Sequence, residues 1–170
     1  MMLPDATIYS LSGFYAMNKF TREVVLFLAQ GAYSGRAPVA PGTAGTAVGV
    51  FVYLWMRRLS PEAYVLFCIL IVLMGAWIAG LAEGLLGKKD HPSIVIDEVA
   101  GYLVSVAMLP GTWSFIIAAF VLFRIFDVMK PCPLKQLQNL HGGAGVMLDD
   151  IGAGVYTNLV LRIVAAVFNI

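Results

Sequence analysis

Long runs of apolar residues, separated by short charged or helix-breaking segments, occupy most of the chain after residue 45. Charged pairs and proline–glycine pairs end helices or place helix ends in water. The runs predict helices over residues 46–56, 62–86, 93–109, 112–129 and 146–168. A helix needs ~20 apolar residues to cross a bilayer, and the first run is short by that measure. The pattern therefore predicts an all-α membrane bundle of four or five spans.

The N-terminal part has a weaker apolar pattern. Residues 14–32 fit a helix with charged residues on one side, but their longest unbroken apolar stretch, residues 24–29, is too short to cross a bilayer. Such a helix is typical of the membrane surface. We expect one domain over residues 1–170, made of an interfacial segment (1–33) and a helical bundle (34–170).

The composition excludes a soluble domain. Apolar residues make up 60% of the chain, charged residues only 12%, and the mean hydropathy is +0.85, whereas soluble domains carry about 25% charged residues. A net charge of +1 gives no reason to expect nucleic acid. Cys68 and Cys132 form neither a disulfide framework nor a zinc pattern. Nothing in the sequence indicates an obligate protein partner.

Positive charges are divided unequally between the two sides of the predicted bundle. If the spans alternate, the side of the N-terminal segment holds Lys19, Arg22, Arg36, Lys88, Lys89, Lys130 and Lys135, and the opposite side holds Arg57, Arg58 and Arg162. Cytoplasmic loops carry the excess of lysine and arginine in membrane proteins. The N-terminal side is therefore predicted to be cytoplasmic.

Five carboxylates lie inside these apolar segments: Asp97, Glu98, Asp127, Asp149 and Asp150. A rise of ~1.5 Å per residue places them about 6–8 Å from helix ends on the N-terminal side. They are either ordinary helix-end charges at the interface or the ligands of a cation that offsets their mutual repulsion. Because acids within membrane helices are costly and oxygen ligands suit hard ions, we favour a Mg²⁺ site.

Basic residues accompany the acids. Arg124, Asp127 and Lys130 recur at three-residue spacing, so they share one face of their helix. Arg124 is either a buried partner of Asp127 or a guanidinium fork for a phosphoryl group, and the two roles are compatible. Lys130 either extends its ammonium to the interface or binds the same anion.

Two glycine-rich stretches precede predicted helices on the N-terminal side, at residues 41–45 and 141–145. Backbone N–H groups at such positions bind anions, which nominates Gly42, Thr43, Gly142 and Gly143 as phosphate contacts. Each stretch is also compatible with a plain turn, and Thr43 with a helix N-cap. Neither stretch is a nucleotide P-loop, because neither contains the Gly-Lys-Ser/Thr sequence that a P-loop requires. His141, eight residues before Asp149, is a candidate for proton transfer.

Four stretches together resemble the phosphatidylglycerophosphatase A family of bacterial enzymes: Pro41-Gly-Thr-Ala-Gly-Thr46, His91-Pro-Ser-Ile-Val-Ile-Asp-Glu98, Phe123-Arg-Ile-Phe-Asp-Val-Met-Lys-Pro131 and His141-Gly-Gly-Ala-Gly-Val-Met-Leu-Asp-Asp150. The resemblance implies Mg²⁺-dependent removal of the terminal phosphate of phosphatidylglycerophosphate, which leaves phosphatidylglycerol and phosphate. It implies a multi-pass protein of the bacterial inner membrane, with the active site on the cytoplasmic side and membrane phospholipid as its partner.

The resemblance suggests a role for each candidate. The five acids form the Mg²⁺ cage. Phosphoryl oxygens are held by Arg124, Lys130 and the two glycine-rich stretches, and His141 moves a proton. Attack on phosphorus by water or by an aspartate remains open. A cation transporter or channel is the main alternative, but it requires acids at several membrane depths. A non-catalytic lipid-binding subunit is another, but it needs no group of five carboxylates.

Overall fold

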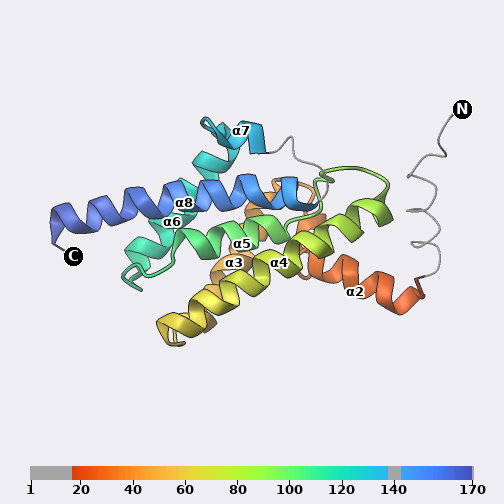
Figure 1. Ribbon diagram of the computed structural model, residues 1–170, viewed down its shortest axis with the longest axis horizontal. Helices are drawn as coiled ribbons and strands as arrows, with labels where there is room; N and C mark the ends of the chain where they lie inside the picture. Colours follow the sequence, from red (N-terminus) through yellow and green to blue (C-terminus); the bar gives the residue numbers. More distant parts are fainter. Residues whose placement is uncertain (1–16, 138–142, 170) are drawn as a thin grey trace, which may run out of the picture.

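The computed structural model describes residues 17–137 and 143–169. This part of the chain is helical and contains no strand. The elements are α2 (Lys19–Ala29), the 3₁₀ turn η1 (Ser34–Arg36), α3 (Pro41–Met56), α4 (Pro61–Leu86), α5 (Ile96–Ser105), α6 (Trp113–Met129), α7 (Leu134–Leu137) and α8 (Gly143–Phe168). Most of the longer helices run along the length of the molecule (Figure 1). The all-α prediction is therefore confirmed.

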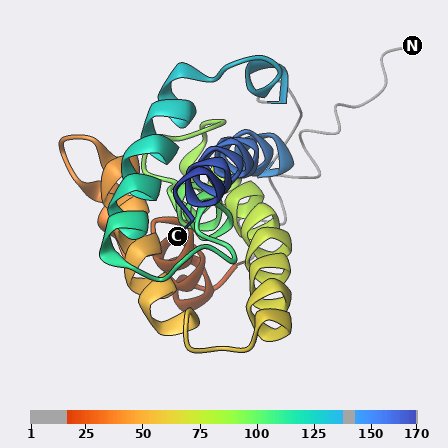
Figure 2. The same cartoon turned by 90° about the vertical axis from the view of Figure 1, so that its left-hand side faces the viewer.

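Helix α5 forms the centre of the bundle. It contacts α3, α4, α6 and α8, which surround it (Figure 2), and seven of its ten residues are buried. Ten residues extend only ~15 Å, half the thickness of a bilayer core, so the predicted span over residues 93–109 is wrong in its length. The apolar residues of α5 face protein instead of lipid, a distinction that hydropathy alone does not make.

The C-terminal end of α5 is held by neighbouring helices. The Asn158 side-chain amide of α8 donates to the carbonyl oxygens of Ser105 (3.1 Å) and Ala107 (2.9 Å). The Tyr64 hydroxyl of α4 donates to the carbonyl oxygen of Leu103 at 2.7 Å. These donors satisfy carbonyl groups that the end of a helix leaves without partners, so α5 can terminate inside the bundle.

Glycines let α5 and α8 pack closely. A Cβ atom on Gly101 would lie 2.7 Å from the carbonyl oxygen of Asp150 and 2.7 Å from the Phe123 ring. A Cβ atom on Gly154 would meet the backbone of Gly101. This close approach brings Asp150 near the first turn of α5, which is the geometry that the site requires.

Helix α3 begins earlier than predicted. Proline at its first position fixes a helical φ, so residues 41–45 form the first turn of α3 and not a separate loop. The N-cap is Ala40, which provides no side-chain hydrogen bond. The N-cap role considered for Thr43 is therefore wrong, because Thr43 lies within the helix.

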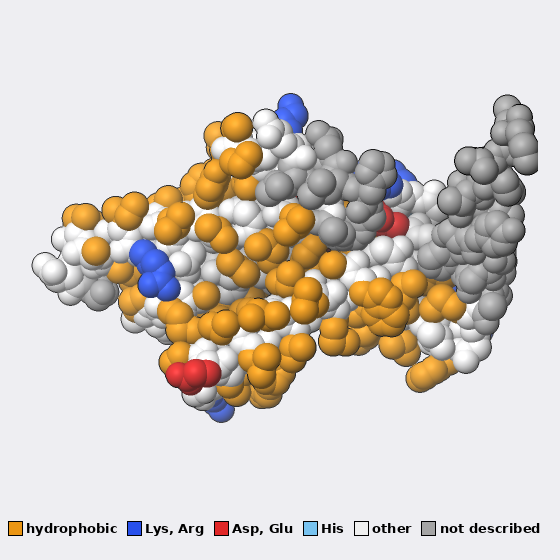
Figure 3. All heavy atoms as spheres, viewed as in Figure 1, with side chains coloured by type: hydrophobic (Ala, Val, Ile, Leu, Met, Phe, Trp, Pro, Cys, Tyr) orange, Lys and Arg blue, Asp and Glu red, His pale blue; other side chains and the backbone are white. Residues whose placement is uncertain are grey.

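Within residues 17–137 and 143–169, two helices are long and apolar enough to cross a membrane, α4 and the Gly145–Phe168 part of α8. Hydrophobic side chains cover much of the face over α4 and α8 in Figure 3. Leu73 and Trp77 on α4 and Ile163 on α8 are each more than 60% exposed. Soluble proteins rarely leave such continuous apolar surface in water, so this face is suited to lipid.

Helix α2 covers the end of α4. The Asn18 side chain caps it by accepting from the backbone N–H of Thr21 at 2.8 Å. Its buried residues, Val25, Leu26 and Ala29, form a hydrophobic cluster with Ile78 and Ala79 of α4. The helix confirms the central part of the predicted segment 14–32, of which residues before 17 lie outside the described range.

Candidate active site

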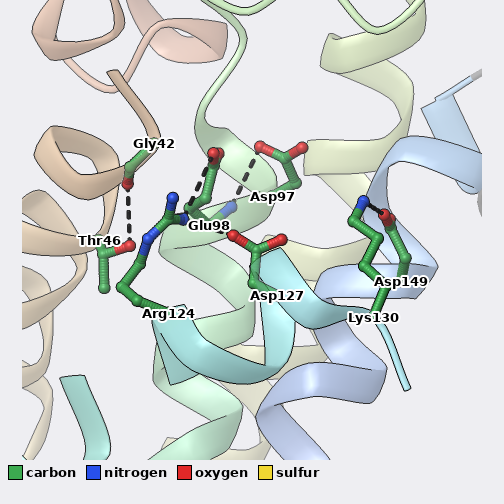
Figure 4. Close-up of polar contacts among 8 residues, drawn as sticks. All are labelled: Gly42, Thr46, Asp97, Glu98, Arg124, Asp127, Lys130 and Asp149. Carbon is green, nitrogen blue, oxygen red and sulfur yellow. Dashed lines mark hydrogen bonds and ion pairs between the residues drawn. The ribbon is translucent and has the colours of Figure 1, made fainter. Parts of the chain in front are cut away.

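Four helix ends converge at one end of the bundle: the N-terminal turns of α3, α5 and α8 and the C-terminal turn of α6. The acids predicted from the sequence project from α5, α6 and α8 near these ends, and Figure 4 shows four of them beside Arg124 and Lys130. The predicted convergence is therefore present in the structure, and the acids separate into a carboxylate cluster and two ion pairs.

The carboxylate cluster consists of Asp97 and Glu98 from α5 and Asp150 from α8. One oxygen atom from each lies within 4.8 Å of the other two. Asp97 and Asp150 are buried, and Glu98 Oε2 is buried without a hydrogen-bond partner among the described residues. Buried like charges at this spacing repel one another, and a cation between them removes that repulsion. The three side chains therefore offer an oxygen site for a hard divalent ion.

Arg124 lies between the carboxylate cluster and α3. Its Nη1 donates to Asp127 Oδ2 at 2.5 Å and lies 3.9 Å from Glu98 Oε1 (Figure 4). The Arg124 side chain is 20% exposed, so it is partly open to its surroundings while Nη1 is paired. Both roles considered for Arg124, partner of Asp127 and receptor for an anion, are compatible with this geometry.

Lys130 and Asp149 form the second ion pair, between the end of α6 and the start of α8. Lys130 ends α6 in the left-handed conformation, with φ at +43°. Burial lowers the pKa of Lys130, but the hydrogen bond and charge of Asp149 more than compensate and raise it overall. Lys130 is therefore a cation at neutral pH, held beside the carboxylate cluster by its partner.

Asp127 and Asp149 lie close to the cluster without belonging to it. Asp127 interacts electrostatically with Glu98 and Asp150. Asp149 Oδ1 is buried and has no hydrogen-bond partner in the described part of the chain. The predicted five-acid cage is thus observed as three clustered acids, and two more that are paired with cations at its edge.

Gly42 sits directly against the Glu98–Arg124 pair. A Cβ atom at Gly42 would lie 2.9 Å from Arg124 Nη2 and 3.0 Å from Nη1, and still closer to Glu98 Oε1. The glycine is therefore required for the close approach of α3 to these side chains, and the phosphate contact predicted for it remains a prediction. Thr43, the next residue, is half-buried and faces α6 beside Arg124.

We expect Gly42→Ala to lower turnover by about tenfold to a hundredfold, because the added methyl group must displace Glu98 or Arg124 and small misplacements of reacting groups are costly. Phosphate release by the purified variant checks this. Gly111→Ala is the matched control, since a Cβ atom there would lie at an ordinary 3.6 Å from the Tyr53 hydroxyl. Equal activity of both variants would contradict the role of Gly42.

The structure describes only the end of the second glycine-rich stretch. His141 and Gly142 lie outside the described residues. Gly143 is the first residue of α8, so the end of this predicted loop belongs to a helix, as in α3. The proton-transfer role of His141 and the phosphate contacts of Gly142 and Gly143 remain predictions.

One hydrogen-bond network beside the site was not predicted from the sequence. The Gln30 side chain donates to Ser93 Oγ at 2.9 Å and accepts from Arg36 Nε at 2.7 Å. Ser93 Oγ also lies 2.8 Å from His91 Nδ1. The network fixes the segment that leads into α5, and therefore positions Asp97 and Glu98. No motif marks it, because a single glutamine on an amphipathic helix is not a distinctive signal.

A family model described as phosphatidylglycerophosphatase A matches residues 27–165. Proteins named phosphatidylglycerophosphatase A are 38% identical over 130 residues in Escherichia coli (75% of this chain, 76% of the relative) and 37% identical over 140 residues in Haemophilus influenzae (79% and 84%). A Bacteroides thetaiotaomicron protein, provisionally named phosphatidylinositol-3-phosphatase, is 35% identical over 138 residues (76% and 86%). No solved structure matches the chain. The chain therefore belongs to the phosphatidylglycerophosphatase A family and is a lipid phosphatase.

Proposed function

We propose that this protein hydrolyses the terminal phosphate monoester of phosphatidylglycerophosphate in a Mg²⁺-dependent reaction at the cytoplasmic face of the bacterial inner membrane. The observation that supports it most is the position of Arg124 beside the cluster of Asp97, Glu98 and Asp150. A dianionic phosphate monoester needs cationic groups on its oxygen atoms, and both a guanidinium and a site for a divalent ion are adjacent here.

The cluster fits Mg²⁺ by its chemistry. All three donors are carboxylates, the ligands that Mg²⁺ prefers, and Glu98 Oε2 lacks another partner among the described residues. In this proposal Asp97, Glu98 and Asp150 hold the ion, and Asp127 and Asp149 border it. A bound Mg²⁺ would supply positive charge against the phosphoryl oxygens.

The remaining side chains have separate tasks. Arg124 binds and orients the phosphoryl group, while Asp127 holds Nη1 of its guanidinium in place. Lys130, held by Asp149, adds a second positive charge. Overall, hydrolysis breaks the bond between phosphorus and the glycerol oxygen and forms one between phosphorus and an oxygen from water, so the leaving glycerol oxygen needs a proton. His141 is our candidate donor, and backbone N–H groups near Thr43 and Gly143 are candidate phosphate contacts.

We further propose that α3, α4, α6 and α8 all cross the bilayer and enclose α5. Helices α3 and α6 have 16 and 17 residues, and Phe51, Trp55, Trp113 and Ile117 on them are more than half exposed. Short spans are accommodated by local thinning of the bilayer. The end of the bundle that carries the carboxylate cluster then lies next to interfacial α2. This is the side with the excess of lysine and arginine, which is typical of the cytoplasmic side.

The transporter alternative has less support. It requires carboxylates at successive depths along a path, whereas the acids of the described residues in α5, α6 and α8 gather at one end of the bundle. A lipid-binding subunit without activity would not need three clustered acids, two of them buried, since their repulsion costs stability unless an ion is bound.

The decisive experiment measures phosphate release from phosphatidylglycerophosphate by the purified protein in detergent. We expect release with Mg²⁺ present, its loss on chelation by EDTA, and its return when Mg²⁺ is added in excess. Phosphatidylinositol 3-phosphate serves as the comparison substrate and should be hydrolysed more slowly. Absence of release from the first lipid, or a rate unaffected by EDTA, would contradict the proposal.

A further inference from the structure

An apolar groove runs along the outside of α6 beside the start of α3, which is its neighbour (Figure 2). Its volume is about 490 Å³. It is lined by Thr43 of α3 and by Phe120, Val121, Arg124, Ile125, Val128 and Met129 of α6. The α6 residues are three pairs of neighbours, and each pair lies four residues after the one before it, which places them in one stripe about 13 Å long on the helix surface.

Arg124 is the only charged side chain among the lining residues. Its guanidinium joins the groove to the carboxylate cluster, because the same group pairs with Asp127 and lies 3.9 Å from Glu98. Phe120 and Val121 lie about one turn farther than Arg124 from the carboxylate end of the bundle. The groove therefore connects the reacting end of the site to the depth at which acyl chains lie.

We propose that this groove binds an acyl chain of the phospholipid substrate, which enters the site sideways from the bilayer between α3 and α6. The inference rests on the proposed function. In a glycerophospholipid carrying a phosphate monoester, an anionic head and an apolar chain belong to one molecule, so its site must place cations beside an apolar surface. The groove meets both requirements, with Arg124 for the phosphate and Phe120, Val121 and Ile125 for the chain.

Two other cavities do not join apolar surface to the reacting groups. One also combines cations, Arg57 and Arg58, with apolar residues, but it lies at the opposite end of the bundle from the carboxylate cluster. Another, along the first turns of α4, is lined by apolar residues and Glu62, which repels phosphate. The groove beside α6 is thus the one among these three that joins apolar surface to the reacting groups.

The test narrows the groove with Val121→Trp and, separately, Ile125→Trp. Each variant is assayed on dipalmitoyl and on dibutyryl phosphatidylglycerophosphate, because the short chains have little apolar surface to bury in the groove. We expect kcat/KM for the dipalmitoyl lipid to fall at least about tenfold, mainly through KM, with the dibutyryl rate within about twofold of wild type. Leu73→Trp, on the exposed face of α4, is the matched control and should match wild type on both.

The outcomes separate the two proposals. If wild type hydrolyses neither lipid, the proposed function fails. If wild type is active and the groove variants lose activity on both substrates equally, or match Leu73→Trp on the dipalmitoyl lipid, the groove assignment is overturned while the function stands.

A photoreactive group in the acyl chain of the substrate gives a measurement on the unaltered protein. It should label α6 in preference to α4 and α8, and equal labelling of all three would also overturn the assignment.

Discussion

Replacing Asp150 with asparagine is expected to reduce phosphate release to below about 1% of wild type, because loss of a direct metal ligand should exceed the 10–100-fold effects of mutating outer-sphere partners. Asp150 is buried on α8 with one carboxylate oxygen within 4.8 Å of Asp97 and Glu98. Asparagine retains the size of the side chain but removes its charge. The change therefore weakens cation binding with little change in packing. Glu62→Gln, an exposed acid at the other end of the bundle, is the control and should retain activity.

The same substitution should have the opposite effect on stability. Without a cation, three clustered carboxylates repel, so Asp150→Asn is expected to unfold at the same or a higher temperature than wild type in EDTA. Adding Mg²⁺ should stabilise wild type by binding the folded state and should stabilise the variant much less. Thermal unfolding in detergent, with and without Mg²⁺, measures both effects. An inactive variant that also unfolds earlier in EDTA would indicate a structural role for Asp150 and contradict the cluster as a cation site.

Hydropathy predicted the outer helices well and the central helix poorly. The runs at residues 62–86, 112–129 and 146–168 correspond to α4, α6 and α8 within a few residues, because each is long, nearly uncharged and flanked by breakers. The run at residues 93–109 is also apolar, but its tertiary contacts determine that it forms a short, buried helix. Val99 and Leu103 are buried among other helices, and the Asn158 side chain donates hydrogen bonds to carbonyl oxygens at the C-terminal end of α5. Local patterns do not contain such contacts.

The acids show the same division between local and long-range information. Their distance from the breakers Pro92, Pro131 and Gly145 places them at one end of the bundle, and that prediction is confirmed. Which acid meets which cation depends on helix rotation and could not be predicted. Asp127 pairs with Arg124 within one helix, as the three-residue spacing suggested, whereas the Lys130–Asp149 pair joins two helices.

The glycines at the start of α3 lie within the helix and not before it. Because glycine after proline is compatible with a turn or an anion-binding loop, the pattern predicts that residues 41–45 precede the helix. In the structure, Gly42 and Gly45 are buried helical residues, where a side chain would collide with Arg124 and Val95 respectively. They serve close packing at the site, a role that a single sequence does not distinguish from a turn.

Replacing Arg124 with glutamine is expected to lower kcat/KM by about 100-fold or more, the size of effect seen when one preorganised donor to a developing oxyanion is removed. It should also destabilise the protein, because Asp127 and Glu98 would lose their cationic partner, and breaking a buried ion pair costs about 3–5 kcal/mol. Both carboxylates are only 12–14% exposed, so water compensates for little of this loss.

Arg124→Lys separates charge from geometry. Lysine retains a positive charge near Asp127 and should restore most of the stability, but it cannot hold a carboxylate and a phosphoryl oxygen with one planar fork. We therefore expect kcat/KM to stay at least about tenfold below wild type while thermal unfolding is nearly normal. Arg57→Lys, which alters an exposed arginine hydrogen-bonded to the carbonyl oxygen of Gly111, is the control and should change neither property. Full activity of Arg124→Lys would show that Arg124 acts only as a charge that stabilises its carboxylate neighbours, and the phosphoryl-binding role would then have to be assigned to Lys130.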